Sequence, residues 1–328
     1  MSDRISLSEL TAKLSDPDIP QQDLARYFKV VPNPDKPFSP IVVVDPMLVE
    51  VGTTAEAAQV QDSVIQAAVI RRQRLYRRKI DGGWQGPRFV AEGDSWFQYP
   101  GIPVLVDGSD VIDFLFDANA IFCTSFAGDT LHNMLTELDK LEGYIAAENA
   151  AALLFSAGGN DLVGRDEVDG NEVGLGRFVR GYSASEPDRQ PAEYVKSRYS
   201  LFLDEIVNDY RKMIDRLLGR FPDLKIFYHG YDRAFPRWRG TWLYPALNEK
   251  EVPEEHWHGV IGVLIDRLNE SLIALAHEYP DRVYHVECRG VIGDKGEWRD
   301  ELHGKEAGCR RAATSFQAAI DRAFAPVS

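Results

Sequence analysis

A serine, an aspartate and a histidine stand in contexts that could support nucleophilic chemistry. Ser95 lies in the segment GDSW, directly after an apolar run, and Asp300 and His303 lie three residues apart in the segment DELH. A serine hydroxyl is a weak nucleophile and needs a nearby base, which a histidine can supply while a carboxylate orients its imidazole. The spacing of Asp300 and His303 lets both side chains meet in a turn or in one turn of a helix. These residue types predict acyl transfer with Ser95 as nucleophile, His303 as base and Asp300 as orienting group.

Two other segments hold residues that suit the stabilisation of a developing oxyanion. Gly128 lies in AGDT, where the absence of a Cβ allows close approach to the backbone, and Asn160 lies in GGND. Donors aimed at such an oxygen are typically worth about 2.7–4 kcal/mol each. Each residue also has a simpler interpretation when taken alone, because Ser95 could cap a helix and Gly128 and Asn160 could shape turns.

The elements that must position these residues follow from the apolar pattern. Short, almost continuously apolar runs alternate with helical patterns, which predicts a parallel α/β sheet covered on both faces. Ligands bind such sheets beyond the carboxyl ends of the strands, where each candidate segment lies. The predicted strands are 88–93, 120–126, 152–158, 224–230 and 282–288, and the clearest predicted helices are 195–217, 260–279 and 305–324.

Four segments, in order, resemble the conserved blocks of the SGNH (GDSL-like) hydrolases over residues 87–328. They are AEGDSWFQYP, SFAGDT, SAGGND and DELH. The resemblance implies a flavodoxin-like three-layer sandwich with a five-stranded parallel sheet and a serine esterase or lipase that needs no cofactor or metal. It implies a Ser95–His303–Asp300 triad, with an oxyanion hole formed by the N–H groups of Ser95 and Gly128 and the side chain of Asn160. The chain departs from the family pattern after His303, where Gly304-Lys305 replaces a frequent Pro-Asn.

Residues 1–86 have no counterpart in that family core and are predicted to form an N-terminal extension. A Pro-rich segment (32–46) is followed by a predicted helix over 54–79, and Asp81-Gly82-Gly83 ends the helix. The end of the helix reads RRQRLYRRK, which favours a solvated basic face, with a docking patch for an acidic partner as the alternative. Residues 1–86 are therefore also a candidate docking region for a protein partner.

Composition limits the class of partner and compartment. The net charge of −14 disfavours wholesale binding to nucleic acid, so a small-molecule, lipid or carbohydrate ester is the expected substrate. The sequence contains no apolar run of the roughly 20 residues that a membrane-spanning helix needs. The start resembles no cleavable signal, which predicts a cytoplasmic protein, although export without such a signal stays open. Three cysteines without metal-ligand spacing predict free thiols.

Two other functions compete with ester hydrolysis. A metal-dependent phosphoesterase would need clustered Asp, His and Asn ligands, and an interaction or effector protein would use residues 1–86 to dock. His256 and His258 could hold a metal, but a solvated loop is the favoured interpretation. The long loop 161–191 is expected to be functional or mobile. Residues that could border the substrate pocket are Tyr231 and Asp232, and those that could form an acyl-binding wall are Trp96, Phe97, Tyr99, Trp242 and Tyr244.

Overall fold

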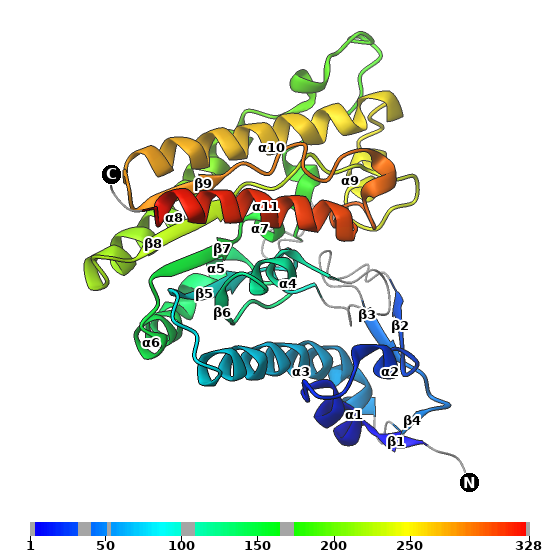
Figure 1. The fold of residues 1–328 in the computed structure, drawn as a ribbon. Helices are drawn as coiled ribbons and strands as arrows, with labels where there is room; N and C mark the ends of the chain where they lie inside the picture. Colours follow the sequence, from blue (N-terminus) through cyan, green and yellow to red (C-terminus); the bar gives the residue numbers. More distant parts are fainter. Residues whose placement is uncertain (1–3, 32–40, 51–53, 100–108, 165–173, 326–328) are drawn as a thin grey trace.

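The computed structural model describes residues 4–31, 41–50, 54–99, 109–164 and 174–325. Its centre is a five-stranded parallel sheet in the order β6-β5-β7-β8-β9, as Figure 1 shows. This confirms the predicted α/β class and the five-stranded sheet, and the order is that of flavodoxin-like folds. The strands are β5 (Arg88–Gly93), β6 (Ala120–Cys123), β7 (Ala152–Ser156), β8 (Lys225–His229) and β9 (Val283–Val286).

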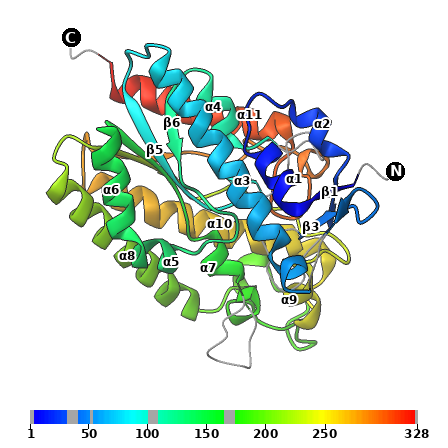
Figure 2. The same ribbon diagram turned by 90° about the horizontal axis from the view of Figure 1, so that it is seen from below.

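Helices cover both faces of the sheet, so the inner strands are buried on both sides. Helices α4 and α11 lie on one face, and α6, α8 and α10 lie on the other (Figure 2). Strand β7 is buried at all of its positions, which explains its continuous apolar sequence. The helices of the two outer layers are α4 (Val111–Phe116), α5 (Leu131–Thr136), α6 (Leu138–Glu148), α8 (Arg198–Arg220), α10 (Glu254–His277) and α11 (Glu306–Ala323).

The candidate residues lie at the topological switch point of the sheet, where successive strands stop being added on one side and are added on the other. The sheet grows from β5 to β6 on one side and then through β7, β8 and β9 on the other. Such a switch point opens a crevice at the carboxyl ends of the two strands that flank it, here β5 and β7. Ser95 follows β5, and Asn160 lies in α7 (Gly159–Val163), just after β7.

The N-terminal part of the chain has a small hydrophobic core of its own. It contains β1 (Ile5–Ser6), α1 (Leu7–Leu14), α2 (Gln21–Ala25), β2 (Phe28–Val31), β3 (Ile41–Val44) and β4 (Val49–Glu50). The long helix α3 (Thr54–Asp81) belongs to both regions, because Val64 and Ala67 pack in the small core and Tyr76 packs in the large one. Helix α3 also packs along strand β6, at the edge of the sheet. The division at residue 86 stays a prediction.

The predicted solvated face at the basic end of α3 is present only in part, because Arg74, Arg77 and Arg78 are exposed. Other cations of this segment are buried or paired. Arg71 is 9% exposed and donates to backbone carbonyls of the segment after α1. Arg72 donates to Asp110 at 2.5 Å, and Arg77 pairs with Glu148, two carboxylates whose side chains are 2% exposed. The acidic partners of Arg72 and Arg77 lie elsewhere in the same chain, and these two ion pairs fasten α3 to the sheet domain. The bonds of Arg71 join α3 to the segment after α1.

Candidate active site

Folding brings Ser95, His303 and Asp300 into one hydrogen-bonded series. The Oγ atom of Ser95 lies 2.8 Å from Nε2 of His303, although the two residues are far apart in the sequence. Nδ1 of His303 lies 2.8 Å from Oδ2 and 3.0 Å from Oδ1 of Asp300. Ser95 is 1% exposed and His303 is 3% exposed. This is the geometry that a nucleophile, a base and an orienting carboxylate require.

Asp300 is held in its ionised form. Burial acts to raise its pKa, but the neighbouring His303 and hydrogen bonds from His303 and from the N–H groups of Leu302 and His303 outweigh burial, so the pKa is lowered. Those N–H groups lie 2.7 Å and 2.8 Å from Oδ1 of Asp300. An ionised carboxylate at Nδ1 fixes the tautomer in which Nε2 can accept a proton from the serine.

The loop that carries Asp300 and His303 is closed at both ends. Trp298 and Gly304 form an isolated antiparallel bridge, and the N–H of Arg299 donates to the carbonyl of His303 at 2.7 Å. A Cβ at position 304 would lie 2.5 Å from Cδ1 of Ile292. A larger residue at position 304 would have to displace the end of the Ile292 side chain, so the glycine fits closely here, and the departure from the family pattern leaves the Asp–His pair intact.

Glu301, inside the same loop, organises a second segment. Its carboxylate is 1% exposed and accepts four backbone N–H groups at 2.7–3.1 Å, from Arg237, Trp242, Leu243 and Tyr244. The segment 237–244 thus wraps around one side chain, and a Cβ at Gly240 would collide with its carboxylate. The ring of Trp242 packs edge-on against His303, with centroids 6.0 Å apart. Glu301 was not among the sequence candidates, because its partners lie about 60 residues upstream.

Asp94 shapes the turn that presents Ser95. Its Oδ1 accepts the N–H of Trp96 at 3.0 Å and the hydroxyl of Ser156 at 2.8 Å, and its Oδ2 accepts the hydroxyl of Tyr231 at 2.5 Å. Burial raises the pKa of Asp94 to about 6, and these hydrogen bonds act in the opposite direction. Asp94 therefore bonds nearby backbone and shapes the loop that carries Ser95.

Tyr231 links the serine turn to the asparagine turn. Its hydroxyl donates to Asp94 and accepts the N–H of Gly159 at 3.1 Å, and its backbone has a φ of 69°. Positive φ is unfavourable for a tyrosine, so the backbone is strained at this residue, where the side chain bridges the two turns. The sequence indicated Tyr231 only as a residue at the border of the pocket. Its bridging role could be recognised only in the folded structure.

His229, which the sequence did not single out, supports this arrangement from beneath. It is fully buried, and burial lowers its pKa to about 3, so its imidazole is neutral. Its Nδ1 accepts the N–H of Tyr231 at 3.1 Å, which leaves Nε2 to donate to Ser156 at 2.9 Å. A second histidine therefore lies near the site, but its bonds join it to Ser156 and Tyr231.

The two candidate oxyanion segments lie against each other. Gly128 has a φ of 88°, a conformation that favours glycine. The side-chain amide of Asn160 donates one hydrogen bond to the carbonyl of Asp129 at 2.5 Å, and an amide has a second N–H. Asp161 accepts the N–H of Leu131 at 2.9 Å. These bonds join the turns after β6 and β7 to each other.

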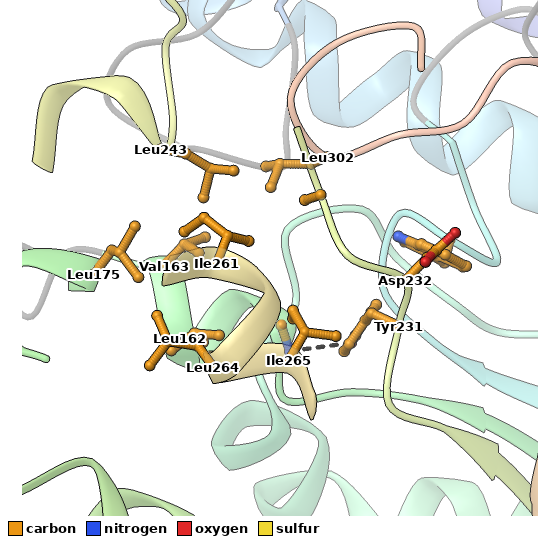
Figure 3. Close-up of a pocket in the computed structure, with 13 residues that line it drawn as sticks. Leu162, Val163, Leu175, Tyr231, Asp232, Leu243, Ile261, Leu264, Ile265 and Leu302 are labelled. Carbon is orange, nitrogen blue, oxygen red and sulfur yellow. Dashed lines mark hydrogen bonds between the residues drawn. The ribbon is translucent and has the colours of Figure 1, made fainter. Parts of the chain in front are cut away.

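The sequence neighbours of Ser95 and His303 help to form an apolar pocket, which we call the aliphatic pocket. Its empty volume is about 430 Å³, including the part open to solvent. Trp96 and Leu302, the neighbours of Ser95 and His303 in sequence, form part of its wall. Figure 3 shows side chains from several elements pointing toward one another around this space. The other lining residues are Gly159, Leu162, Val163, Leu175, Tyr231, Asp232, Ala234, Leu243, Ile261, Leu264 and Ile265.

The predicted aromatic wall is only partly present. Trp96 lines the aliphatic pocket, whereas Phe97 is buried against Phe316 in the core and Tyr244 packs on other aromatic rings. Aliphatic residues form most of the wall instead. Tyr231 and Asp232 border the pocket, as predicted. Within the predicted loop 161–191, Leu175 reaches the pocket, but residues 165–173 lie outside the described part of the chain.

The solvated loop predicted around His256 and His258 is wrong. Both residues lie in helix α10, and His258 stacks on Phe235 with ring centroids 3.7 Å apart. Within the described ranges, no three His, Cys, Asp or Glu side chains are grouped so that they could hold a metal ion. Cys123 and Cys288 are buried, in line with the predicted core thiols, and Cys309 is half-buried. None of the described helices combines the length and apolar character needed to cross a bilayer.

The chain was compared with known proteins. No protein-family model and no curated protein matches the sequence. Similar solved structures include a lipase from a goat rumen metagenome (12% identity, 71% of this chain and 97% of that chain, TM-score 0.48). Another is a GDSL-like lipase from Bacteroides thetaiotaomicron, with 14% identity, 76% of this chain and 98% of that chain covered, and a TM-score of 0.44. A third is a family 3 carbohydrate esterase from Clostridium thermocellum, with 14% identity, 73% of this chain and 99% of that chain covered, and a TM-score of 0.43. Further similar structures are a putative GDSL-like lipase from Parabacteroides merdae and a member of the lipolytic protein G-D-S-L family from Veillonella parvula.

Proposed function

We propose that the protein hydrolyses carboxylic esters through an acyl-enzyme formed on Ser95. The observation that carries this proposal is the pair of contacts from Ser95 Oγ to His303 Nε2 and from His303 Nδ1 to Asp300, both 2.8 Å at their shortest. Base, nucleophile and orienting carboxylate are thus within hydrogen-bonding reach before any substrate binds. Preorganisation of this kind lowers the barrier because the reacting groups need not be brought together in the transition state.

In the proposed reaction, His303 takes the proton of Ser95 as its oxygen attacks the ester carbonyl. The negative charge that develops on the carbonyl oxygen is stabilised by the N–H groups of Ser95 and Gly128 and the side-chain amide of Asn160. His303 then gives its proton to the departing alcohol, which leaves an acyl group on Ser95. Water attacks the acyl-enzyme with His303 again as base, releasing the acid and restoring the serine. Asp300 stabilises the imidazolium in both half-reactions.

The aliphatic pocket suggests the acyl group of the substrate. Its wall is almost wholly apolar and begins at the residues next to Ser95 and His303. Burying one methylene contributes about 0.8 kcal/mol, which corresponds to roughly fourfold in rate. We therefore expect kcat/KM for 4-nitrophenyl esters to rise by about fourfold per methylene from acetate upward until the pocket is filled, and then to fall. No turnover of any ester in this series would contradict the proposed function.

Enlarging this pocket should move the acyl-length optimum. Leu264 lies in α10 and lines the pocket, so Leu264→Ala should shift the optimum toward longer esters by one or two methylenes. Leu268, one turn further along the same helix, is equally buried but is not among the lining residues. Leu268→Ala is the matched control, because both variants should lose about 2–5 kcal/mol of stability. If both variants keep the wild-type optimum, the pocket does not hold the acyl chain.

Removing the hydroxyl of Tyr231 should slow turnover without preventing binding. In Tyr231→Phe, Asp94 loses a donor and the N–H of Gly159 loses its acceptor, so both turns are less firmly held. We expect kcat to fall by about tenfold, with a much smaller change in KM, because alignment counts most in the transition state. Tyr210→Phe is the control, since it removes another buried hydroxyl, bonded to the carbonyl of Ala157. Equal effects on kcat in the two variants would show that Tyr231 has only a structural role.

A further inference from the structure

A second pocket, which shares Trp96 with the aliphatic pocket, contains a charged side chain that the proposed reaction does not use. We call it the Arg299 pocket; it is small, with an empty volume of about 250 Å³ that includes the part open to solvent, and Ser95 and His303 both line it. A group bound there would lie in direct reach of the reacting atoms. The other lining residues are Trp96, Tyr99, Ser109, Asp110, Ile292, Gly304 and Cys309.

The guanidinium of Arg299 is firmly placed and incompletely bonded. It stacks over the ring of Tyr99 at 4.1 Å, and that ring packs against His303 with centroids 5.1 Å apart. The backbone of Arg299 is fixed by its bond to the carbonyl of His303. Its Nε and Nη2 atoms are buried and have no hydrogen-bond partner among the described residues. Buried donors of a charged group are costly to leave unpaired, so this arrangement favours a role in binding.

The carboxylates near this pocket have other partners. Asp300 accepts hydrogen bonds from His303 and from two backbone N–H groups. Asp110 pairs with Arg72 and accepts the N–H of Tyr99 at 2.9 Å. Among the described residues, neither carboxylate pairs with Arg299, so its charge is available to a ligand. A guanidinium presents two N–H donors in a fork that suits carboxylate and phosphate oxygens.

We infer that Arg299 binds an anionic group, a carboxylate or a phosphate, on the alcohol portion of the ester substrate. The inference rests on the proposed function, since it takes the aliphatic pocket as the site of the acyl chain. With the acyl chain there and the ester carbonyl at Ser95, the Arg299 pocket receives the leaving alcohol. The expected substrate class is therefore an aliphatic acyl ester of an alcohol that carries a negative charge.

Matched chromogenic esters test this selectivity. 4-Nitrophenyl butyrate is compared with 3-carboxy-4-nitrophenyl butyrate, which adds one carboxylate to the leaving group. Relative to the wild type, Arg299→Gln should lower the ratio of kcat/KM for the carboxylated ester to kcat/KM for the neutral ester by about 10- to 100-fold. Arg299→Lys keeps the positive charge but not the forked pair of N–H donors, so its selectivity for the carboxylated ester should lie between those of the wild type and Arg299→Gln. Butyryl-glycerol 3-phosphate and monobutyryl-glycerol form a second pair that distinguishes phosphate from carboxylate.

Arg310→Gln is the control for net charge, because Arg310 lies on α11 with a side chain that is 60% exposed and is not among the residues of the pocket. It should leave the ratio of the two rates unchanged. A ratio in Arg299→Gln equal to that of the wild type, or a parallel fall for both esters, would overturn the inference. Failure of the wild type to cleave either neutral ester would instead count against the proposed function. In that case calorimetric titration with inorganic phosphate still tests the role of Arg299. Arg299→Gln should weaken the binding of phosphate at least tenfold. Equal binding by the two proteins, or no binding by either, rejects the inference.

Discussion

Ser95→Ala should lower kcat for a 4-nitrophenyl ester by roughly 10⁴- to 10⁶-fold, the range typical of serine hydrolases that lose the nucleophile. The fold should survive, because the change removes one hydroxyl, which is hydrogen-bonded to the side chain of His303. The measurement is the release of nitrophenol by wild type and variant, with unfolding curves to compare their stability. Ser200→Ala, on the exposed surface of helix α8, is the control and should behave as the wild type does.

Two further measurements identify Ser95 as the acylated residue. A fluorophosphonate reagent should label the wild type once, at Ser95, and should not label Ser95→Ala. The double variant Ser95→Ala/His303→Ala should be no slower than either single variant, because residues that act as one unit have non-additive effects. Turnover by Ser95→Ala above one tenth of the wild-type value would reject the proposed nucleophile.

Glu301→Ala should reduce the free energy of unfolding by about 3 kcal/mol or more, since each buried donor left unpaired costs about 1–3 kcal/mol. The variant strips four backbone N–H groups in the segment 237–244 of their acceptor. Denaturant unfolding followed by tryptophan fluorescence measures the loss. Activity should fall as well, because the loosened segment carries Trp242, which packs against His303.

Glu297→Ala provides the comparison for Glu301. Glu297 lies in the same region of the chain, but its side chain is 46% exposed and pairs with Arg311 at the surface. An exposed pair of this kind typically contributes about 0–1 kcal/mol, so this variant should be nearly as stable as the wild type. Glu301→Gln keeps one acceptor oxygen and should lie between the other two variants. Equal stability of Glu301→Ala and Glu297→Ala would show that segment 237–244 holds its shape without the carboxylate.

The sequence predicted what depends on local pattern. Strand β5 begins and ends where its apolar run does, and helices α8 and α11 lie within a few residues of their predicted ranges. Burial on both faces of a sheet leaves a continuous apolar run, and burial of one helix face leaves a stripe. The proximity of Ser95 to the DELH loop followed from the sheet, because the carboxyl ends of parallel strands meet at one edge.

What the sequence missed depends on partners that are distant in the chain. Glu301 looks like any acidic residue until segment 237–244 is folded around it, and Tyr231 bridges two turns that are otherwise separate. The arginines of α3 were expected to face solvent because charge alone does not tell where an opposite charge will lie. His258 was expected in a solvated loop because no third metal ligand was evident in the sequence, whereas it lies in α10 and packs on Phe235.

The attachment of α3 limits how the chain can be shortened. A recombinant fragment that starts at residue 87 would contain all four family-like motifs but would lack Arg72 and Arg77, the cations that neutralise Asp110 and Glu148. An uncompensated buried carboxylate typically costs about 3–5 kcal/mol, so two of them would consume much of the stability of an average domain. Truncated versions meant for crystallisation or directed evolution should therefore retain the whole of α3 and start no later than Thr54.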